Sequence, residues 1–181
     1  RLGMAVLELL PDRFPGDFVT PFPGLRPATL LDIWLLCKDL RPDDIEHYMA
    51  MSFDNQWDFE RAAVAFHARP GFKFCLEAED GRPLAVAGWA EQAPGTFDGW
   101  MVSTPETWDD AGKRLTRACR WGIRYMFEVV GARRLQLETL DSRTGACEWY
   151  ERGLKMLPER VRYGYGRNGE NVACFYKLRG A

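Results

Sequence analysis

The residues with the clearest chemical meaning form a cationic run, Gly112-Lys113-Arg114, followed by Arg117 one helical turn later. The run opens a long stretch of helix-forming sequence. A helix begins at its positive dipole end, so basic side chains are unfavourable there unless an anion lies between them and the backbone. Glycine lets the backbone come close to such an anion. We therefore expect a phosphate-type anion site on these four residues. The alternative is a solvated basic face, which Arg120 continues.

Three carboxylates in or near predicted strands are candidates for taking a proton from a substrate: Glu91, Asp98 and Glu138. A carboxylate does this directly or through a water molecule. The alternative for each is an exposed side chain on the solvent face of its strand. The two histidines, His47 and His67, fall on predicted helices, where we expect surface or capping roles rather than catalysis.

Other catalytic chemistries find little support in the composition. The five cysteines are scattered without a Cys-x-x-Cys spacing, which is typical of free thiols in a reducing compartment rather than of disulfides or a zinc site. Two histidines are too few for a histidine-rich metal site, so we expect no metal. None of the three serines lies in a Gly-x-Ser-x-Gly turn, which disfavours a serine hydrolase.

Charge and hydropathy exclude two further classes. The 181 residues include 24 basic and 26 acidic ones and carry a formal net charge of −2, without the basic footprint of a general nucleic-acid binder. The longest uncharged apolar run, Leu84–Ala90, is far shorter than the ~20 residues that a membrane-spanning helix needs. The apolar segment Met4–Leu10 lacks the features of a secretory signal. We expect a cytoplasmic protein with neither nucleic-acid nor membrane partners.

The length predicts one domain with a substantial core. Residues 1–24 are rich in proline and glycine and are expected to form an N-terminal arm, and residues 25–181 are expected to form the domain. Arg1–Gly3 are expected to be an extension ahead of a native start at Met4. Two roles stay open for the arm: packing across the domain, or mediating a homodimer.

Hydrophobic periodicity predicts the elements that must position these residues. Thr29 and Asp43 are expected to cap two helices, and the first helix is expected to bury a stripe that includes Leu31 and Leu35. The predicted order is helices over 29–40, 43–51 and 57–68, strands over 72–76, 84–90 and 97–104, a polar loop over 103–112, a helix over 113–130 ended by Gly131, a strand over 134–140, a short helix over 145–152, and a hairpin of 161–165 with 172–178. A strand meander followed by a strand–helix–strand crossover predicts a mixed α/β sheet with flanking helices.

Three segments in this order have recognisable sequences. Residues 25–33 read Leu-Arg-Pro-Ala-Thr-Leu-Leu-Asp-Ile, residues 81–88 read Gly-Arg-Pro-Leu-Ala-Val-Ala-Gly, and residues 146–154 read Ala-Cys-Glu-Trp-Tyr-Glu-Arg-Gly-Leu. They resemble the opening, the hairpin and the last helix of the GNAT (Gcn5-related N-acetyltransferase) superfamily, and the similarity extends over residues 25–178. Residues 25–44 and 99–108 are also similar to a branch of bacteriophage GNAT-like proteins, some of which are internal virion proteins.

The resemblance implies a central mixed, mostly antiparallel sheet with flanking helices and a V-shaped splay beside residues 100–103. It implies an N-acyltransferase that moves an acyl group from acetyl-CoA, or another acyl-CoA, to an amine of a small molecule or protein. In this family, backbone N–H groups of the strand at the splay hold the thioester and the pantetheine arm. The resemblance therefore assigns Met101, Val102 and Ser103 to the CoA thioester.

The same resemblance suggests roles for individual side chains. Tyr150 matches the family's tyrosine that protonates the departing thiolate, and a phenol with a pKa of ~10 suits that task. The alternative is a core aromatic beside Trp149. Asp98 is the first choice for the base because it lies just ahead of the acyl-binding strand, and Glu91 is kept as a further candidate. Arg143 stands where the family often has asparagine and is assigned to CoA binding.

The cationic run departs from the family pattern, in which a glycine-containing loop with two glycine or alanine positions binds the CoA pyrophosphate. Residues 104–114 contain one glycine and three acidic residues, and carboxylates beside a pyrophosphate weaken its binding. The cations at 113 and 114 offset this in part.

Two hypotheses therefore stay open. One is a phage-encoded acyltransferase that acts in the host cytoplasm. The other is a catalytically silent GNAT-fold phage protein that serves as a virion component or binds a host protein through the retained cleft. A cleft blocked by Trp108 or by the acidic segment would favour the second.

Overall fold

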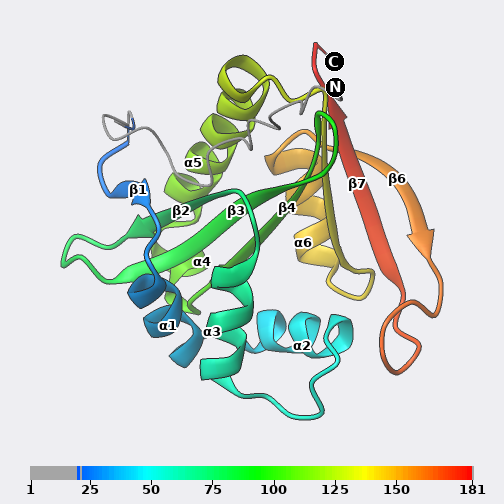
Figure 1. Ribbon diagram of the computed structural model, residues 1–181, viewed down its shortest axis with the longest axis horizontal. Helices are drawn as coiled ribbons and strands as arrows, with labels where there is room; N and C mark the ends of the chain where they lie inside the picture. Colours follow the sequence, from blue (N-terminus) through cyan, green and yellow to red (C-terminus); the bar gives the residue numbers. More distant parts are fainter. Residues whose placement is uncertain (1–19, 21, 181) are drawn as a thin grey trace, which may run out of the picture.

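The computed structural model describes residue 20 and residues 22–180, so residues 1–19 and 21 of the predicted arm, Arg1–Gly3 included, lie outside the described part. Seven strands form one sheet in the order β1-β2-β3-β4-β5-β7-β6 (Figure 1). The strands are β1 Leu25–Pro27, β2 Phe72–Glu77, β3 Pro83–Ala93, β4 Thr96–Ser103, β5 Arg134–Leu140, β6 Leu157–Arg162 and β7 Val172–Leu178. Neighbours pair antiparallel except β4 and β5, which are parallel. The predicted mixed, mostly antiparallel sheet is confirmed.

The two parallel strands meet only at one end. β4 pairs with β5 through residues 96–98 and 134–136, and the pairing stops there. From residue 99 onward β4 stays paired with β3, while the rest of β5 stays paired with β7. The sheet therefore opens between them, which confirms the predicted V-shaped splay beside residues 100–103. One backbone edge of β4 is left without a neighbouring strand over this stretch.

Helices cover both faces of the sheet (Figure 1). On one face, Leu36 and Phe66 pack against Val86 and Val102 of the sheet. On the other face, Leu115 packs against strand residues such as Ala85, because successive side chains of a strand point to opposite faces. The first face carries α1 Leu30–Lys38, α2 Pro42–Met51 and α3 Phe59–Ala68, and the second carries α5 Gly112–Tyr125 and α6 Thr144–Glu148. α5 and α6 each continue into a π-helical turn, over Met126–Val130 and Trp149–Gly153 respectively. The two faces of the sheet thus pack into separate hydrophobic clusters.

The start of α1 shows what the motif at residues 25–33 does. The Thr29 hydroxyl accepts the Asp32 N–H at 3.2 Å, and the Asp32 carboxylate accepts the Thr29 N–H at 2.8 Å. This capping box satisfies N–H groups that the first turn of a helix leaves unpaired. Arg26 of β1 donates to the same carboxylate at 2.7 Å and ties α1 to the sheet edge. The predicted cap at Thr29 is confirmed.

The buried side of α1 differs from the prediction. Leu31 is 64% exposed and Leu35 is 41% exposed, whereas Ile33, Leu36 and Cys37 are buried. Almost every residue over 30–37 is apolar, so periodicity does not select one face of this helix. Contact with α3 and the sheet makes the selection instead.

Two other predicted features are wrong. Asp43 does not cap α2, because Arg41 precedes the helix and Pro42 occupies its first position, where a missing N–H removes no helical bond. The stretch over 103–112 is not only a loop, since α4 forms over Glu106–Asp110. The buried Thr107 hydroxyl anchors this short helix by donating to a β3 carbonyl at 2.6 Å.

Candidate functional site

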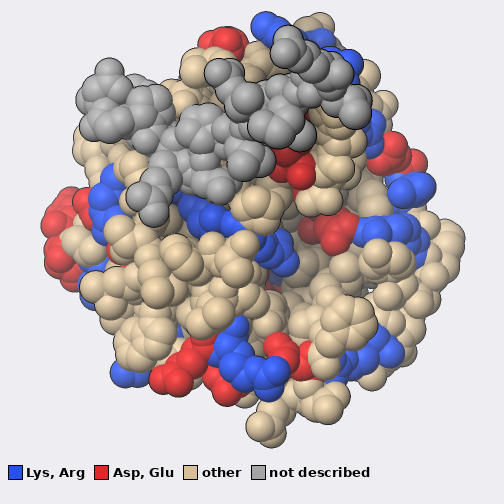
Figure 2. Space-filling model, viewed as in Figure 1, with Lys and Arg blue, Asp and Glu red and all other residues tan. Residues whose placement is uncertain are grey.

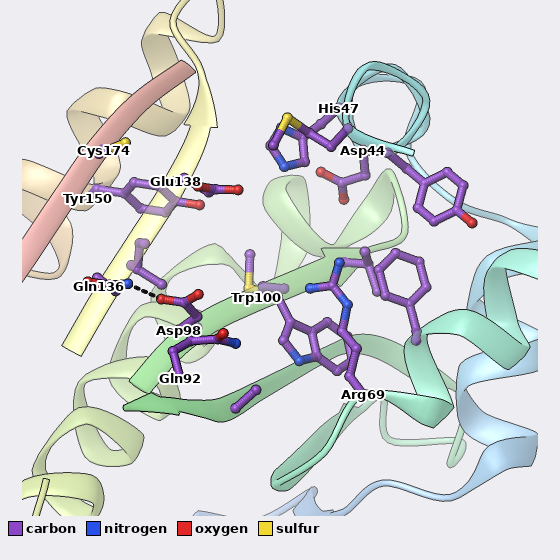
Figure 3. Close-up of a pocket in the computed structure, with 18 of the residues that line it drawn as sticks. Asp44, His47, Arg69, Gln92, Asp98, Trp100, Gln136, Glu138, Tyr150 and Cys174 are labelled. Carbon is purple, nitrogen blue, oxygen red and sulfur yellow. Dashed lines mark hydrogen bonds between the residues drawn. The ribbon is translucent and has the colours of Figure 1, made fainter. Parts of the chain in front are cut away.

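The splay of the sheet forms one wall of a cavity of about 440 Å³. Strands β4, β5 and β7 contribute one side of it, and α2 and the end of α3 contribute the other (Figure 3). The volume lies within the range of small-molecule sites. On the face of the molecule that Figure 2 shows, acidic and basic side chains lie close together.

Helix α2 presents one polar face to this cavity. Asp44, His47, Tyr48 and Met51 follow one another at offsets of three, four and seven residues from Asp44, and all four line the cavity. Residues at these offsets share one side of an α-helix. The helix was predicted, but the positions of Asp44 and His47 in the cavity wall were not. A polar stripe at helical spacing is the signal that would have found them.

Asp44 connects the two halves of the opened sheet. Its carboxylate accepts the Ser103 N–H at 3.0 Å and the Ser103 hydroxyl at 3.3 Å, both at the end of β4. The other carboxylate oxygen pairs with Arg143, which follows β5, at 2.6 Å. All three residues are largely shielded from solvent. Two residues assigned to CoA binding, Ser103 and Arg143, are therefore held by a carboxylate that the sequence did not single out.

At the splay, the N–H groups of β4 point alternately towards β3 and into the opening. The Thr104 N–H donates to β3 at the Leu84 carbonyl, whereas the Ser103 N–H points the other way, to Asp44. Because N–H direction alternates along a strand, the Met101 N–H points into the splay like that of Ser103. Met101 and Val102 both line the cavity. Met101 thus offers a backbone donor without a strand partner, as the resemblance to the family requires.

Tyr150 lies opposite this edge of β4, at the start of the π-helical turn. Its ring packs against Trp149 at 5.6 Å and Phe175 at 5.4 Å, and its hydroxyl points into the cavity (Figure 3). Burial raises the pKa of this hydroxyl above its ordinary value, with Arg143 opposing the shift and Asp44 adding to it. The phenol therefore keeps its proton at neutral pH and remains a hydrogen-bond donor.

The three candidate bases have different surroundings. Asp98 lines the cavity and accepts a hydrogen bond from the Gln136 amide across the last paired rung of β4 and β5 (Figure 3). Glu138 also lines the cavity, but its carboxylate pairs with Arg162. Glu91 lies outside the cavity lining and accepts the Gly95 N–H at 2.8 Å in the β3–β4 turn. The structure brings Asp98, but not Glu91, to the same cavity as Tyr150.

His47 was expected on the surface, and the structure places it in the cavity wall instead. Its Nδ1 atom is buried and has no hydrogen-bond partner within the described residues. Burial, together with the positive charges of Arg143 and Arg69, lowers the pKa of His47 to about 4. The imidazole is therefore neutral at physiological pH. Sequence reasoning missed it because polar residues on a helix, such as Asp44 and His47, usually face solvent.

The cationic run is divided by the structure. Gly112 begins α5, and a Cβ atom there would meet nothing within 4 Å, so the backbone is open to approach. Lys113 and Arg117 are exposed and form no ion pair with another described residue. Arg114 turns towards the sheet edge and donates to the Glu77 carbonyl. Lys113 and Arg117 remain available to an anion, whereas Arg114 is engaged within the chain.

Trp108 of α4 contacts residues at the end of β4 and on the helix that follows β5. Its indole N–H donates to the Ser103 hydroxyl at 3.1 Å, and its ring meets Trp149 edge-on at 4.9 Å. The guanidinium of Arg41 lies 5.3 Å from the centre of the same ring. These contacts join the end of β4 to the helix that carries Tyr150.

Two kinds of feature are absent from the described residues. No three or more His, Cys, Asp and Glu side chains gather in a metal-binding arrangement among residues 22–180. Within that same stretch, every helix is too short or too polar to cross a bilayer.

This chain resembles known proteins in structure but not in sequence. No protein-family model matches the chain, and no curated protein sequence matches it. Solved structures do match. A GNAT-family acetyltransferase of Bacillus anthracis has a TM-score of 0.67 at 12% identity, with 88% of this chain and 97% of that chain covered.

Two further structures agree with this result. The spermidine N-acetyltransferase of Vibrio cholerae, in complex with CoA and spermine, has a TM-score of 0.66 at 14% identity, covering 86% of this chain and 94% of its own. The ribosomal-protein-S5-alanine acetyltransferase of Vibrio fischeri has a TM-score of 0.66 at 12% identity, covering 91% and 98%. At these identities the likeness concerns the fold alone, and the chain has the fold of the GNAT acetyltransferases.

Proposed function

We propose that the chain is an acyl-CoA-dependent N-acyltransferase, with acetyl-CoA or another acyl-CoA as donor and an amine of a small molecule or protein as acceptor. One observation carries the proposal: the splay brings a backbone N–H without a strand partner, a partly buried tyrosine and a carboxylate to one cavity. Acyl transfer from a thioester needs a group that polarises the carbonyl, an acid for the leaving thiolate and a base for the amine. Met101, Tyr150 and Asp98 supply these functions.

Two parts of the chain suit the two ends of an acyl-CoA donor. At the start of α5, the open backbone of Gly112 and the side chains of Lys113 and Arg117 suit phosphate groups. At the splay, the Met101 N–H and the adjoining Val102 suit the thioester end. When bound, acyl-CoA supplies an acyl group activated as a thioester. The predicted contributions of Arg114, Ser103 and Arg143 require these residues to leave or share their present partners.

The chain's own residues act on protons and on developing charge. Asp98, oriented by Gln136, takes the proton that the acceptor nitrogen must lose before or while the new C–N bond forms. The Met101 N–H stabilises negative charge on the acyl oxygen. Tyr150 gives its proton to the sulfur as the C–S bond breaks, which yields an amide and free CoA. The raised pKa of Tyr150 keeps that proton in place until the sulfur needs it.

The test combines binding with turnover. Acetyl-CoA is titrated into the protein by calorimetry, and release of free CoA thiol is then followed with a panel of primary amines. We expect saturable binding and thiol release that depends on the amine. Asp98→Asn should lower turnover by about 10²-fold or more, whereas Glu91→Gln, a carboxylate outside the cavity, should not. Thiol release at the same rate in both variants would contradict the role of Asp98.

A second candidate is favoured by the contacts that close the cofactor side. Asp44 occupies the Ser103 N–H, and Trp108 packs against Trp149 beside it. In this alternative the chain is a silent GNAT-fold protein of phage origin that acts as a virion component or binds a host protein through the cavity. The same titration decides between the two, because a silent protein would show neither binding of acetyl-CoA nor thiol release with any amine.

A further inference from the structure

The charges around the cavity do not all remain available to a ligand. Asp44 is paired with Arg143, Glu138 with Arg162, and Glu159 with Arg134. The charged lining residues are four acidic and four basic ones, and the partner of Glu159, Arg134, lies outside the lining. The lining residues that remain outside these pairs are one anion, Asp98, and two cations, Arg69 and Arg160. None of these three forms an ion pair with another described residue. A cavity built only to hold a polyamine would carry the opposite excess.

Arg69 is held in place by aromatic rings. Its guanidinium lies 5.4 Å from the centre of the Phe66 ring and 5.4 Å from that of Trp100. The two rings are themselves stacked at 5.2 Å. Trp100 in turn lies against Gly88 of β3, where a Cβ atom would approach the indole nitrogen to 2.7 Å. The cation is therefore positioned by a rigid support, as a specific ligand contact requires.

Asp98 and Arg69 occupy different sides of the cavity (Figure 3). Asp98 comes from β4 beside Gln136, whereas Arg69 follows α3 and lies below Asp44 and His47 in this view. The unpartnered Nδ1 atom of His47 belongs to the same side as Arg69 and adds a neutral polar group there. One side can therefore receive an ammonium group and the other an anion.

We propose that the acceptor is an amine that also carries a carboxylate or phosphate group, with the amine beside Asp98 and the anion on Arg69. The inference rests on the proposed N-acyltransferase function, since it assigns the cavity to the acceptor. A guanidinium forms paired hydrogen bonds with either kind of anion. A cavity of about 440 Å³ accommodates a small amphoteric molecule of this kind.

Direct binding tests this without relying on turnover. Glycine, β-alanine and γ-aminobutyrate are each compared with their amides, which keep the amine and the size but lack the anion. O-Phosphoethanolamine tests phosphate in place of carboxylate, and spermidine tests a pure polycation. Each probe is titrated by calorimetry into the protein, alone and with CoA present. We expect at least one anionic probe to bind about 10-fold or more tightly than its uncharged counterpart, and spermidine to bind more weakly than that probe.

Variants connect the preference to Arg69. Arg69→Gln should reduce the ratio of acid to amide affinity by about 10- to 100-fold, and Arg69→Lys should keep part of it. Arg124→Gln, an exposed arginine on α5 away from the cavity, should leave the ratio unchanged. Thermal unfolding of each variant shows that it is folded.

Three results would overturn the inference: equal affinity for every acid and its amide, absence of binding by all probes, or an anion preference that survives Arg69→Gln. Amine-dependent thiol release that ignores the anion would leave the acyltransferase function standing while removing this inference. Binding of the anionic probes without thiol release would do the reverse.

Discussion

The splay has two sides whose polar groups are paired differently. The side proposed for the cofactor includes Ser103 and Arg114, and the side proposed for the acceptor includes His47, Arg69 and Tyr150. On the cofactor side, Arg114 donates to the Glu77 carbonyl and the Ser103 N–H is held by Asp44. On the acceptor side, the Tyr150 hydroxyl, the His47 Nδ1 atom and the guanidinium of Arg69 have no hydrogen-bond or ion-pair partner among the described residues. A donor molecule must therefore compete with contacts inside the chain, whereas an acceptor meets groups that are ready to bind. The polar groups of the acceptor side are therefore better preorganised for binding than those of the cofactor side.

The largest expected effect is a loss of turnover on removal of the Tyr150 hydroxyl. Tyr150→Phe keeps the packing of the ring against Trp149 and Phe175 and removes only the hydroxyl. Turnover should fall by about 10²- to 10⁴-fold if the hydroxyl protonates the thiolate. Affinity for acetyl-CoA, measured by calorimetry, should be nearly preserved because the lost contact belongs to the transition state. A variant with full turnover would show that Tyr150 is a core aromatic only.

The next effect concerns the bridge that closes the cofactor side. Asp44→Ala leaves Arg143 largely buried without its partner, and this should lower the free energy of unfolding by about 3 kcal/mol. The double variant Asp44→Ala/Arg143→Met removes both charges and should recover most of that loss. Denaturant unfolding measures both. Equal stability of the single and double variants would argue that the two halves are not held together by this pair.

A pH series sharpens the acceptor side of the comparison. The pKa of His47 is about 4 in the folded protein, below the ordinary value of 6.5, so the unfolded chain binds this proton more readily between those values. Its contribution to stability is fully present above pH 6.5. It falls by about 1.4 kcal/mol for each pH unit below that, down to about pH 4.

Unfolding free energies at pH 7, 6 and 5 check this. His47→Gln cannot titrate, so it should lose that part of the pH dependence while the carboxylates keep theirs. An identical slope in the wild type and the variant would mean that His47 is not shielded in the cavity wall.

The smallest expected effect separates two neighbouring cations on the cofactor side. Lys113→Ala should weaken acetyl-CoA binding by about 1 kcal/mol, and the loss should shrink with added salt because screening reduces Coulomb attraction. Arg114→Ala should instead lower stability by about 1 kcal/mol, since its guanidinium supports the Glu77 carbonyl. Calorimetry and thermal unfolding of both variants measure the two quantities. Unchanged affinity in Lys113→Ala would assign the basic face to solubility or to a partner.

Local sequence patterns predicted much of the fold. The strand over 134–140 has the predicted bounds, and Gly131 ends the long helix in the left-handed conformation that glycine favours. Boundaries failed where tertiary contacts decide them. The closing hairpin begins earlier than predicted, at Leu157, because β6 pairs along β7 over a stretch of mixed polarity. The side of α1 that is buried depends on α3, which no window of α1 contains.

The candidate site divides in the same way. Met101, Tyr150 and Asp98 were located by resemblance and by strand position, and the structure brings all three to one cavity. His47 and Arg69 were not singled out, because they reach the cavity wall only where α2 and the end of α3 lie beside β4 in the folded chain. Residue spacing within one segment does not show which other segments lie beside it in the fold. The polar stripe on α2 was visible, but polar residues on a helix usually face solvent.

The brief contact between β4 and β5 also affects how the molecule holds together. The strands β1–β4 are continuous in the chain over residues 25–103, and β5–β7 over residues 134–178, so each group pairs mostly within itself. In the sheet, only residues 96–98 and 134–136 join the two groups. A ligand bound in the opening would contact both groups of strands. At a concentration 100 times its dissociation constant it adds about 2.7 kcal/mol to the stability of the whole. The free energy of unfolding would then rise with the concentration of the ligand.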